Sequence, residues 1–144
     1  MISKPILATL TCAAAAVLPA FPAGATPSSG VSAQTLLETT VPAVGTSEAT
    51  VLTLRRIAIA PGGTTGWHYH DGPVYAYVES GTLTRTLQDC TIVTTTKGQT
   101  VAEGHGSNQV HMGANLGTAP LVLLALYVQP EGDPLSENAS DPRC

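Results

Sequence analysis

The sequence has little charge. Only 11% of its 144 residues are charged, and six lysines and arginines stand against ten aspartates and glutamates, for a net charge of −4. So few basic side chains argue against a nucleic-acid partner and leave no basic face for anionic lipid. The length suits one compact domain.

Helical periodicity is also missing. Between Gln34 and Gln129, no stretch combines a sustained helical period with helix caps. Threonine and valine are abundant there, and glycine and proline divide the chain into short runs, which is typical of an all-β sandwich or barrel. We therefore predict a single β-barrel domain over residues 34–130. The expected strands are Thr35–Thr40, Thr50–Ile59, Thr65–His70, Val74–Glu79, Thr82–Gln88, Thr91–Thr96, Thr100–Glu103, Gln109–Asn115 and Leu121–Gln129.

The N-terminus has the order of a secretory signal peptide. Lys4 provides one positive charge, Pro5–Phe21 is apolar or small, and Ala23-Gly24-Ala25 is a small-x-small cleavage signal. An uncleaved membrane anchor is the alternative, but Pro19 and Pro22 interrupt the apolar run. We predict that residues 1–25 are removed on export to the periplasm or the extracellular space. No membrane contact is expected after cleavage.

Cysteine is scarce, with three residues in all. Cys12 lies in the predicted signal peptide, so Cys90 and Cys144 remain in the mature chain. Two cysteines in an exported protein predict one disulfide, which would pin the C-terminus to the domain and contribute about 4 kcal/mol by chain entropy. Two free thiols are the alternative. Residues 26–33 are expected to form a flexible leader, and residues 131–144 an irregular acidic tail.

The longest apolar run of the domain is Leu121–Val128, with eight apolar residues in a row. It is far too short to span a bilayer, and it suits a strand that is covered on both faces. Either the core alone or a subunit interface explains such a run.

The stretch "GWHYH" places two histidines one residue apart. Side chains of a strand alternate between faces, so His68 and His70 point the same way, with α-carbons about 6.6 Å apart. Neutral imidazoles so placed can converge on one ion of Zn, Cu, Fe or Ni. A third ligand must come from elsewhere, and His111, on another expected strand, is the candidate.

With His111, the sequence resembles the cupin family. The first cupin motif reads Gly, five residues, His-x-His, three or four residues, Glu, six residues, Gly. In this chain Gly62, His68-Tyr69-His70 and Gly81 follow that pattern. The second motif reads Gly, five residues, Pro-x-Gly, two residues, His, three residues, Asn. Its counterparts here are Gly98, Gly106, His111 and Asn115.

The chain departs from the cupin pattern in three places. The metal-binding Glu is absent, and its slot holds Val74 or, with the longer spacing, Tyr75. Gly104 stands where the family has proline. Two extra residues precede His111, which makes His105 a rival third ligand, although only His111 is followed by asparagine at the right distance.

The resemblance implies a small cupin barrel, of the double-stranded β-helix or jelly-roll kind, that holds a metal inside through His68, His70 and His111. The ion would be a divalent transition metal, with Fe favoured over Mn, Ni, Zn or Cu. Three neutral ligands leave positions open for water, dioxygen or substrate. A three-histidine iron centre looks like that of the thiol and diketone dioxygenases, so oxygenation of a small organic molecule is the implied reaction.

Few other side chains are candidates for the chemistry. If the longer spacing holds, Tyr75 points inward and could donate a proton or orient a ligand. Glu103 ends a strand and is a candidate fourth ligand or base, although a carboxylate at the edge of a loop is more often solvated. Arg85 could meet an acidic substrate, but a lone arginine on a strand is usually at the surface. Asn115 is expected to be a structural turn residue.

Two other functions fit the same residues. One is a non-catalytic cupin that binds a small ligand or a metal. The other is a structural exported barrel that associates with itself through a strand such as Leu121–Val128. The resemblance also makes a homodimer the default expectation for the assembly.

Overall fold

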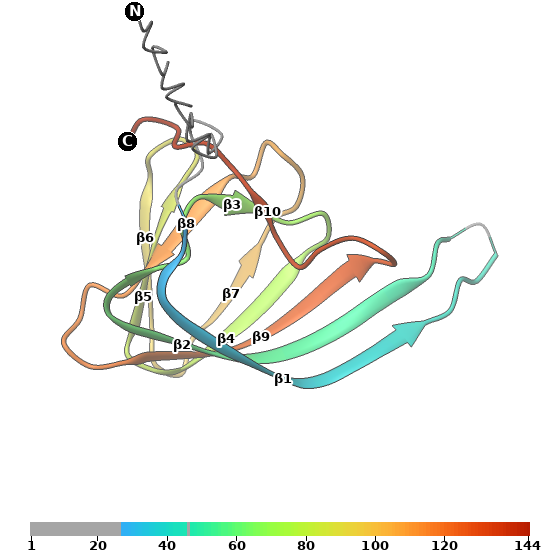
Figure 1. Cartoon of the computed structure of the whole chain (residues 1–144), viewed down its shortest axis with the longest axis horizontal. Coiled ribbons are helices and arrows are strands. Elements are labelled where there is room, and N and C mark those ends of the chain that lie inside the picture. Colours follow the sequence, from blue (N-terminus) through green and yellow to red (C-terminus); the bar gives the residue numbers. More distant parts are fainter. Residues whose placement is uncertain (1–26, 46) are drawn as a thin grey trace, which may run out of the picture.

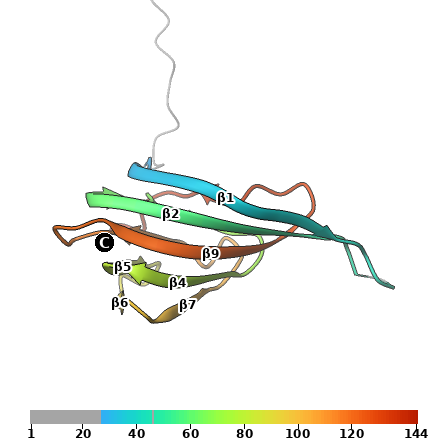
Figure 2. The ribbon, with the colours of Figure 1, turned by 90° about the horizontal axis from the view of Figure 1, so that it is seen from below.

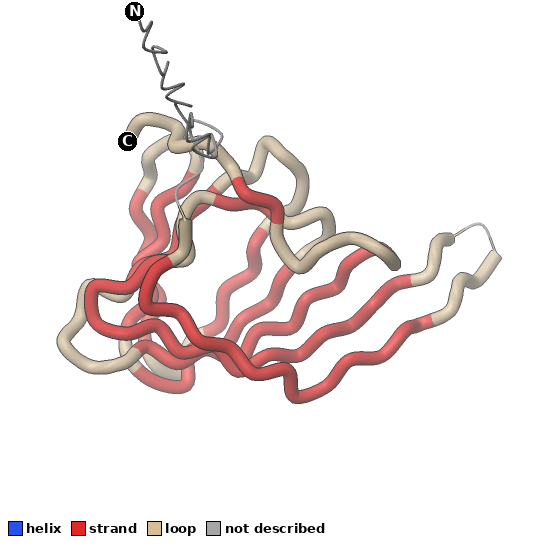
Figure 3. Tube along the Cα trace, in the orientation of Figure 1, coloured by secondary structure: helices blue, strands red, loops and turns tan. Residues whose placement is uncertain are grey.

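The computed structural model describes residues 27–45 and 47–144. The predicted signal peptide, residues 1–25, and Thr26 lie outside the described residues. Every regular element in the described part is a strand, as the red and tan trace of Figure 3 shows. Among these residues, no helix is long and apolar enough to cross a membrane. The prediction of an all-β fold is therefore confirmed.

Residues 27–45 and 47–144 form ten strands. They are β1 (Ser29–Val41), β2 (Thr50–Thr64), β3 (His68–Tyr69), β4 (Val74–Ser80), β5 (Thr82–Leu87), β6 (Ile92–Thr96), β7 (Thr100–Glu103), β8 (His111–Ala114), β9 (Leu121–Pro130) and β10 (Glu137–Asn138). Most of the expected strands are present with similar bounds. The largest differences are that β1 begins at Ser29, that β2 continues to Thr64, that β3 is reduced to two residues and that β10 was not expected.

The strands form one antiparallel sheet that curls into a nearly closed barrel. One path of neighbours runs β10-β3-β8-β2-β9-β4-β7, while β1 pairs with β2, and β5 pairs with both β6 and β8. Figure 2 shows β1, β2, β9, β4 and β7 side by side in one layer. In Figure 1 the short strands β3 and β8 lie across the interior from this layer.

Strand β2 joins the two layers. It pairs with β9 from Thr50 to Ile59, and its last residue, Thr64, pairs with Ala114 of β8. At the corner Gly62 adopts φ +74°, a backbone conformation that side chains other than glycine rarely tolerate. The glycine that opens the first motif therefore lets one strand serve both layers.

Alternation along the strands builds the core. In β9 every second residue from Leu121 is buried, and the residues between are half-buried on the outer face. Polar side chains are also buried, among them Thr53, Thr95, Asn115 and Gln129. The apolar core residues are Ile57, Ile59, Val74, Ala76, Val78, Leu83, Val101, Leu121, Leu123, Ala125 and Tyr127. Within one chain, β9 is thus fully covered on one face only. A homodimer through its outer face stays a prediction.

Both flanking segments are more ordered than expected. Ser29–Ala33, expected in the flexible leader, belong to β1 and pair with β2 along the edge of the sheet. In the C-terminal tail, Glu137–Asn138 form β10, which pairs with His68–Tyr69 of β3. Backbone pairing was not foreseen because it depends on a distant partner strand rather than on local composition.

The two remaining cysteines confirm the predicted pairing. Cys90 and Cys144 form a disulfide with their α-carbons 5.4 Å apart. Cys90 lies in the turn between β5 and β6, so the bond ties the end of the C-terminal tail to that hairpin (Figure 1). Before it reaches the disulfide, the tail pairs with β3.

Candidate metal centre

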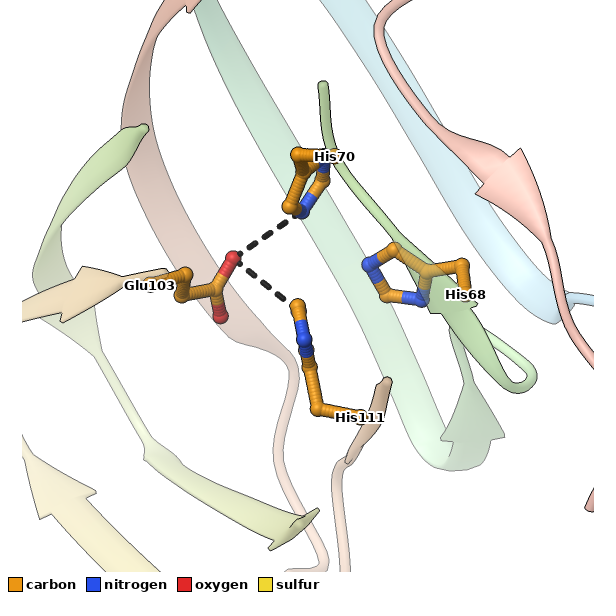
Figure 4. Close-up of side chains that lie close together, drawn as sticks. All are labelled: His68, His70, Glu103 and His111. Carbon is orange, nitrogen blue, oxygen red and sulfur yellow. Dashed lines mark hydrogen bonds and ion pairs between the residues drawn. The ribbon is translucent and has the colours of Figure 1, made fainter. Parts of the chain in front are cut away.

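Four polar side chains converge inside the barrel. His68 and His70 come from β3 and the residue after it, Glu103 ends β7, and His111 begins β8. One ligand atom of each lies within 4.8 Å of the others. His70 and His111 are only 2% and 3% exposed. Figure 4 shows the four side chains pointing toward one common centre.

Strand pairing brings the three histidines together. The antiparallel register places His68 directly opposite His111. Their ring centroids are 4.4 Å apart, and that of His70 is 4.9 Å from His68. The prediction that His68 and His70 share a face and meet His111 agrees with this geometry.

Backbone carbonyls set the orientation of every ring. Nδ1 of His68 lies 3.0 Å from the carbonyl oxygen of Gly66, and Nδ1 of His111 lies 2.9 Å from that of Gln109. Nδ1 of His70 lies 2.7 Å from the carbonyl oxygen of Leu135, in the C-terminal tail. A carbonyl accepts and cannot donate, so each ring carries a proton on Nδ1 and turns Nε2 toward the cluster.

The inner atoms of the cluster are all acceptors when the rings are neutral. Nε2 of His70 and Nε2 of His111 each lie 3.2 Å from Oε2 of Glu103. Nε2 of His111 is buried, and no described residue donates a hydrogen bond to it. Lone pairs that face one another in a buried site need a cation between them. The residues present therefore fit a metal ion.

At His68 and Glu103, electrostatics favours the protonation states that a metal requires. Burial lowers the pKa of His68 to about 4. Burial also opposes ionisation of Glu103, but its close contacts with the imidazoles of His111 and His70 outweigh burial and hold the pKa of this carboxyl well below its usual range. At neutral pH His68 is thus a neutral ligand and Glu103 an ionised one.

Glu103 supplies the carboxylate that the first motif lacks. Val74 occupies the slot of the missing glutamate, and it is the direct cross-strand partner of Glu103. Both side chains face the interior, where Val74 is 2% exposed. The expectation of three neutral ligands without a carboxylate is thereby corrected in favour of the alternative that named Glu103 as a fourth ligand, because the neighbouring strand places its carboxylate in the cluster. The information that would have identified Glu103 as this carboxylate is the pairing of β4 with β7, which the sequence does not show.

The other sequence candidates lie outside the cluster. Tyr75 is 51% exposed on the outer face of β4, so its interpretation as an inward proton donor is wrong. The spacing that places Val74 inward is the correct one. His105 is exposed and is not part of the cluster, as the asparagine at the matching distance from His111 had indicated.

Asn115 has the structural role that was expected of it. It is 1% exposed, and its Nδ2 donates to the carbonyl oxygens of Ile59 and Ala119 at 2.8 and 2.9 Å. Its Oδ1 accepts a hydrogen bond from the backbone of Gly117 at 3.0 Å. The side chain thus holds the turn after β8 and keeps His111 in register.

Two further residues lie near the cluster, and only Arg85 was considered from the sequence. Tyr127, on β9, has its ring centroid 5.7 Å from that of His70, and burial raises its pKa to about 12. The phenol therefore keeps its proton at neutral pH. Arg85, expected at the surface, is largely buried, with Nη1 3.7 Å from Oε1 of Glu103.

Two cavities border the cluster. One of about 570 Å³ is lined by Arg85, Glu103 and His111 together with polar and apolar residues of the β5–β6 turn and the β7–β8 loop. A small internal cavity of about 50 Å³ lies against His68, His70, Glu103 and Tyr127. The larger cavity gives a small molecule access to the side of the cluster where Glu103 and His111 lie.

Comparison with known proteins places the chain. A family model described as "Cupin domain" matches residues 55–127, which is half of the chain. No curated protein matches it. Many solved structures share the fold, among them the polyketide cyclase RemF from Streptomyces resistomycificus, with 19% identity, a TM-score of 0.60, and 78% of this chain and 73% of that chain covered.

Two further structures illustrate how general the likeness is. A cupin-like protein from Thermotoga maritima has 20% identity and a TM-score of 0.59, with 77% of each chain covered. An uncharacterised protein with a double-stranded β-helix domain from Klebsiella pneumoniae has 21% identity and a TM-score of 0.57, with 81% of this chain and 91% of that chain covered. Such identities establish a shared fold and not a shared activity.

Proposed function

The chain belongs to the cupin family, and on that basis we propose that it is an exported metalloprotein that oxidises a small organic molecule with dioxygen. One divalent transition metal would be held by His68, His70, Glu103 and His111, with Fe favoured. Mn, Ni, Zn and Cu are the alternatives, because imidazole and carboxylate ligands accept several of these ions.

The observation that carries the proposal is the convergence of three imidazole Nε2 atoms and one carboxylate. Their ligand atoms lie within 4.8 Å of one another, and each ring is locked by a carbonyl behind it. Ligands held from behind in this way are pre-organised, which raises metal affinity. A redox-active ion in such a site supplies the electrons and the binding position that dioxygen chemistry needs.

The chain's own residues would provide the rest of the site. The cavity beside Glu103 and His111 is large enough, at about 570 Å³, to admit a small organic molecule. The phenol of Tyr127 lines the small internal cavity and keeps its proton. It is therefore available as a hydrogen-bond donor inside the barrel.

Export is supported by the cysteine pair. The Cys90–Cys144 disulfide is of a kind that persists in oxidising compartments and is rare in the reducing cytosol. Together with the signal-like N-terminal sequence, it favours a periplasmic or extracellular location. Edman sequencing of the protein recovered from that compartment tests this part of the proposal, with Thr26 expected as the first residue.

Elemental analysis followed by turnover assays tests the function. Protein purified from its own compartment should contain about one transition metal ion per chain. Oxygen consumption is then measured with a panel of small thiols, diketones and phenols. Metal content with no oxygen uptake on any of them would reject the oxygenase, and absence of metal would reject the centre itself.

A non-catalytic cupin is the second candidate. The cavity beside the cluster favours it, because a space of this size binds a small ligand whether or not a reaction follows. Such a protein would retain the metal and bind ligands. The optical spectra of its complexes would then stay constant over many hours in air. Product analysis of the same incubations separates the two functions.

A further inference from the structure

Arg85 is a cation on the inner face of the barrel, beside the cluster. It lies on β5 between Leu83 and Leu87, opposite Gly113 of β8. Its side chain is 11% exposed, and it lines the cavity that Glu103 and His111 also border. The alternation of β5 would suit an apolar residue at this position, so an arginine here calls for an anionic counterpart.

The guanidinium is only partly satisfied within the chain. Nη1 lies 3.7 Å from Oε1 of Glu103, while Nε is buried and has no acceptor among the described residues. An arginine cannot shed its proton, and its five donors form a planar fork that matches a carboxylate. One long contact to Glu103 leaves most of this fork available.

Glu103 places Arg85 and the metal ligands side by side. Its Oε2 faces His70 and His111, and its Oε1 faces Arg85. A molecule in the cavity can therefore meet the guanidinium with one end and the metal position with the other. The two oxygens of the Glu103 carboxyl group already reach from the guanidinium to the metal position. The carboxylate and the metal-binding atom of the bound molecule would therefore be separated by only one or two carbons.

We propose that Arg85 selects small carboxylic acids whose second polar group, such as a thiol or a hydroxyl, reaches the metal. This inference rests on the proposed metal centre and adds the substrate class. The charges agree with it. The charged residues that line the cavity are Arg85, Asp89 and Glu103, so a divalent ion changes their sum from negative to positive. An organic anion is thus expected to bind the metal-loaded protein only.

A pair of thiols that differ in charge tests the inference. The purified protein is loaded with Co²⁺ and titrated with mercaptoacetate or with neutral 2-mercaptoethanol, and the thiolate-to-cobalt absorption reports binding. We expect mercaptoacetate to bind at least about tenfold more tightly, the effect of one charge-assisted hydrogen bond. In Arg85→Gln the ratio should fall to about twofold or less, with the affinity for 2-mercaptoethanol unchanged.

Arg56→Gln is the matched control. Arg56 is also a strand arginine paired with a glutamate, but it is exposed and bonds Glu79 far from the cavity. This variant should keep the wild-type preference for mercaptoacetate. Arg85→Met, which keeps most of the side-chain length, should lose the preference as Arg85→Gln does, and it serves if the glutamine variant does not fold.

The outcomes separate this inference from the function it rests on. If the wild-type protein takes up no Co²⁺, the metal centre fails and the inference with it. If it takes up Co²⁺ but binds the two thiols equally, the centre stands and the role of Arg85 is overturned. A preference for mercaptoacetate that persists in Arg85→Gln or Arg85→Met also overturns it.

Discussion

Val74 and Glu103 are direct neighbours across β4 and β7, with both side chains turned into the barrel. Val74 occupies the slot in which the cupin motif has its metal-binding glutamate. The carboxylate of this chain thus reaches the cluster from the next strand instead. Side chains paired in this way have β-carbons about 4.5–5.5 Å apart, so a carboxylate on either strand can reach the same centre.

This relationship predicts that the carboxylate can be exchanged between the two strands. Glu103→Val should weaken metal binding by at least about tenfold, because it removes the one charged ligand. The double variant Val74→Glu/Glu103→Val should recover a substantial part of that loss. Calorimetric titration with Zn²⁺ measures both. Val74→Glu without the second change is the control. If the double variant binds Zn²⁺ no more tightly than Glu103→Val does, the exchange is contradicted.

The identity of the third histidine is tested by a pair of alanine variants. His111→Ala should abolish metal retention after dialysis, because its buried Nε2 points at the cluster. His105→Ala should retain metal as the wild type does, because His105 is exposed and outside the cluster. Metal content per chain is the measurement. The reverse result would show that the second motif is aligned incorrectly.

The protonation of His111 in the metal-free protein depends on Glu103. Burial lowers the pKa of His111, but the hydrogen bond to Glu103 outweighs burial and raises the pKa above its usual value. In metal-free Glu103→Gln the raising contribution is gone, so the pKa of His111 should fall below that of the metal-free wild type. NMR titration of the imidazole protons measures it, and an unchanged pKa would mean that the two side chains do not meet.

The disulfide should support both stability and the metal centre. The tail that Cys144 anchors carries the carbonyl of Leu135, which orients His70 through a 2.7 Å hydrogen bond. Loss of the bond in Cys90→Ser/Cys144→Ser should reduce the free energy of unfolding by about 4 kcal/mol in the chain-entropy model. Metal affinity should also fall by about tenfold, as for other changes behind a ligand.

Urea unfolding and calorimetric titration give these two quantities. The wild type treated with a reductant should lose the same stability as the double serine variant, whereas the variant should not respond to the reductant. Wild-type metal affinity in the serine variant would show that the tail holds His70 without the help of the disulfide.

Asn115 should be a site of large destabilisation without direct contact with the metal. Asn115→Ala removes three hydrogen bonds at once and leaves the buried carbonyl of Ile59 without this donor. A loss of about 2–4 kcal/mol is expected, since each unsatisfied buried group costs about 1–3 kcal/mol. Asn108→Ala, at an exposed position, should change stability by less than about 0.5 kcal/mol in the same urea experiment.

Features that depend on short stretches of sequence were predictable. The alternation of apolar residues indicated the strands, and the spacing of His68 and His70 indicated a shared face. Glycines at turns such as Gly81 and Gly98, with φ of +80° and +87°, marked where strands end. The cupin motifs added His111 and Asn115, because the second motif fixes the number of residues between its histidine and its asparagine.

By itself, then, the sequence determined that this chain forms a β-barrel and that three of its histidines belong to one site. Only the tertiary structure decided that Glu103 replaces the missing glutamate, that Arg85 faces the same cavity, and that the C-terminal tail supports His70. The reason is that alternation along a strand sets which face a side chain takes, whereas the choice and register of the partner strand depend on contacts between distant segments.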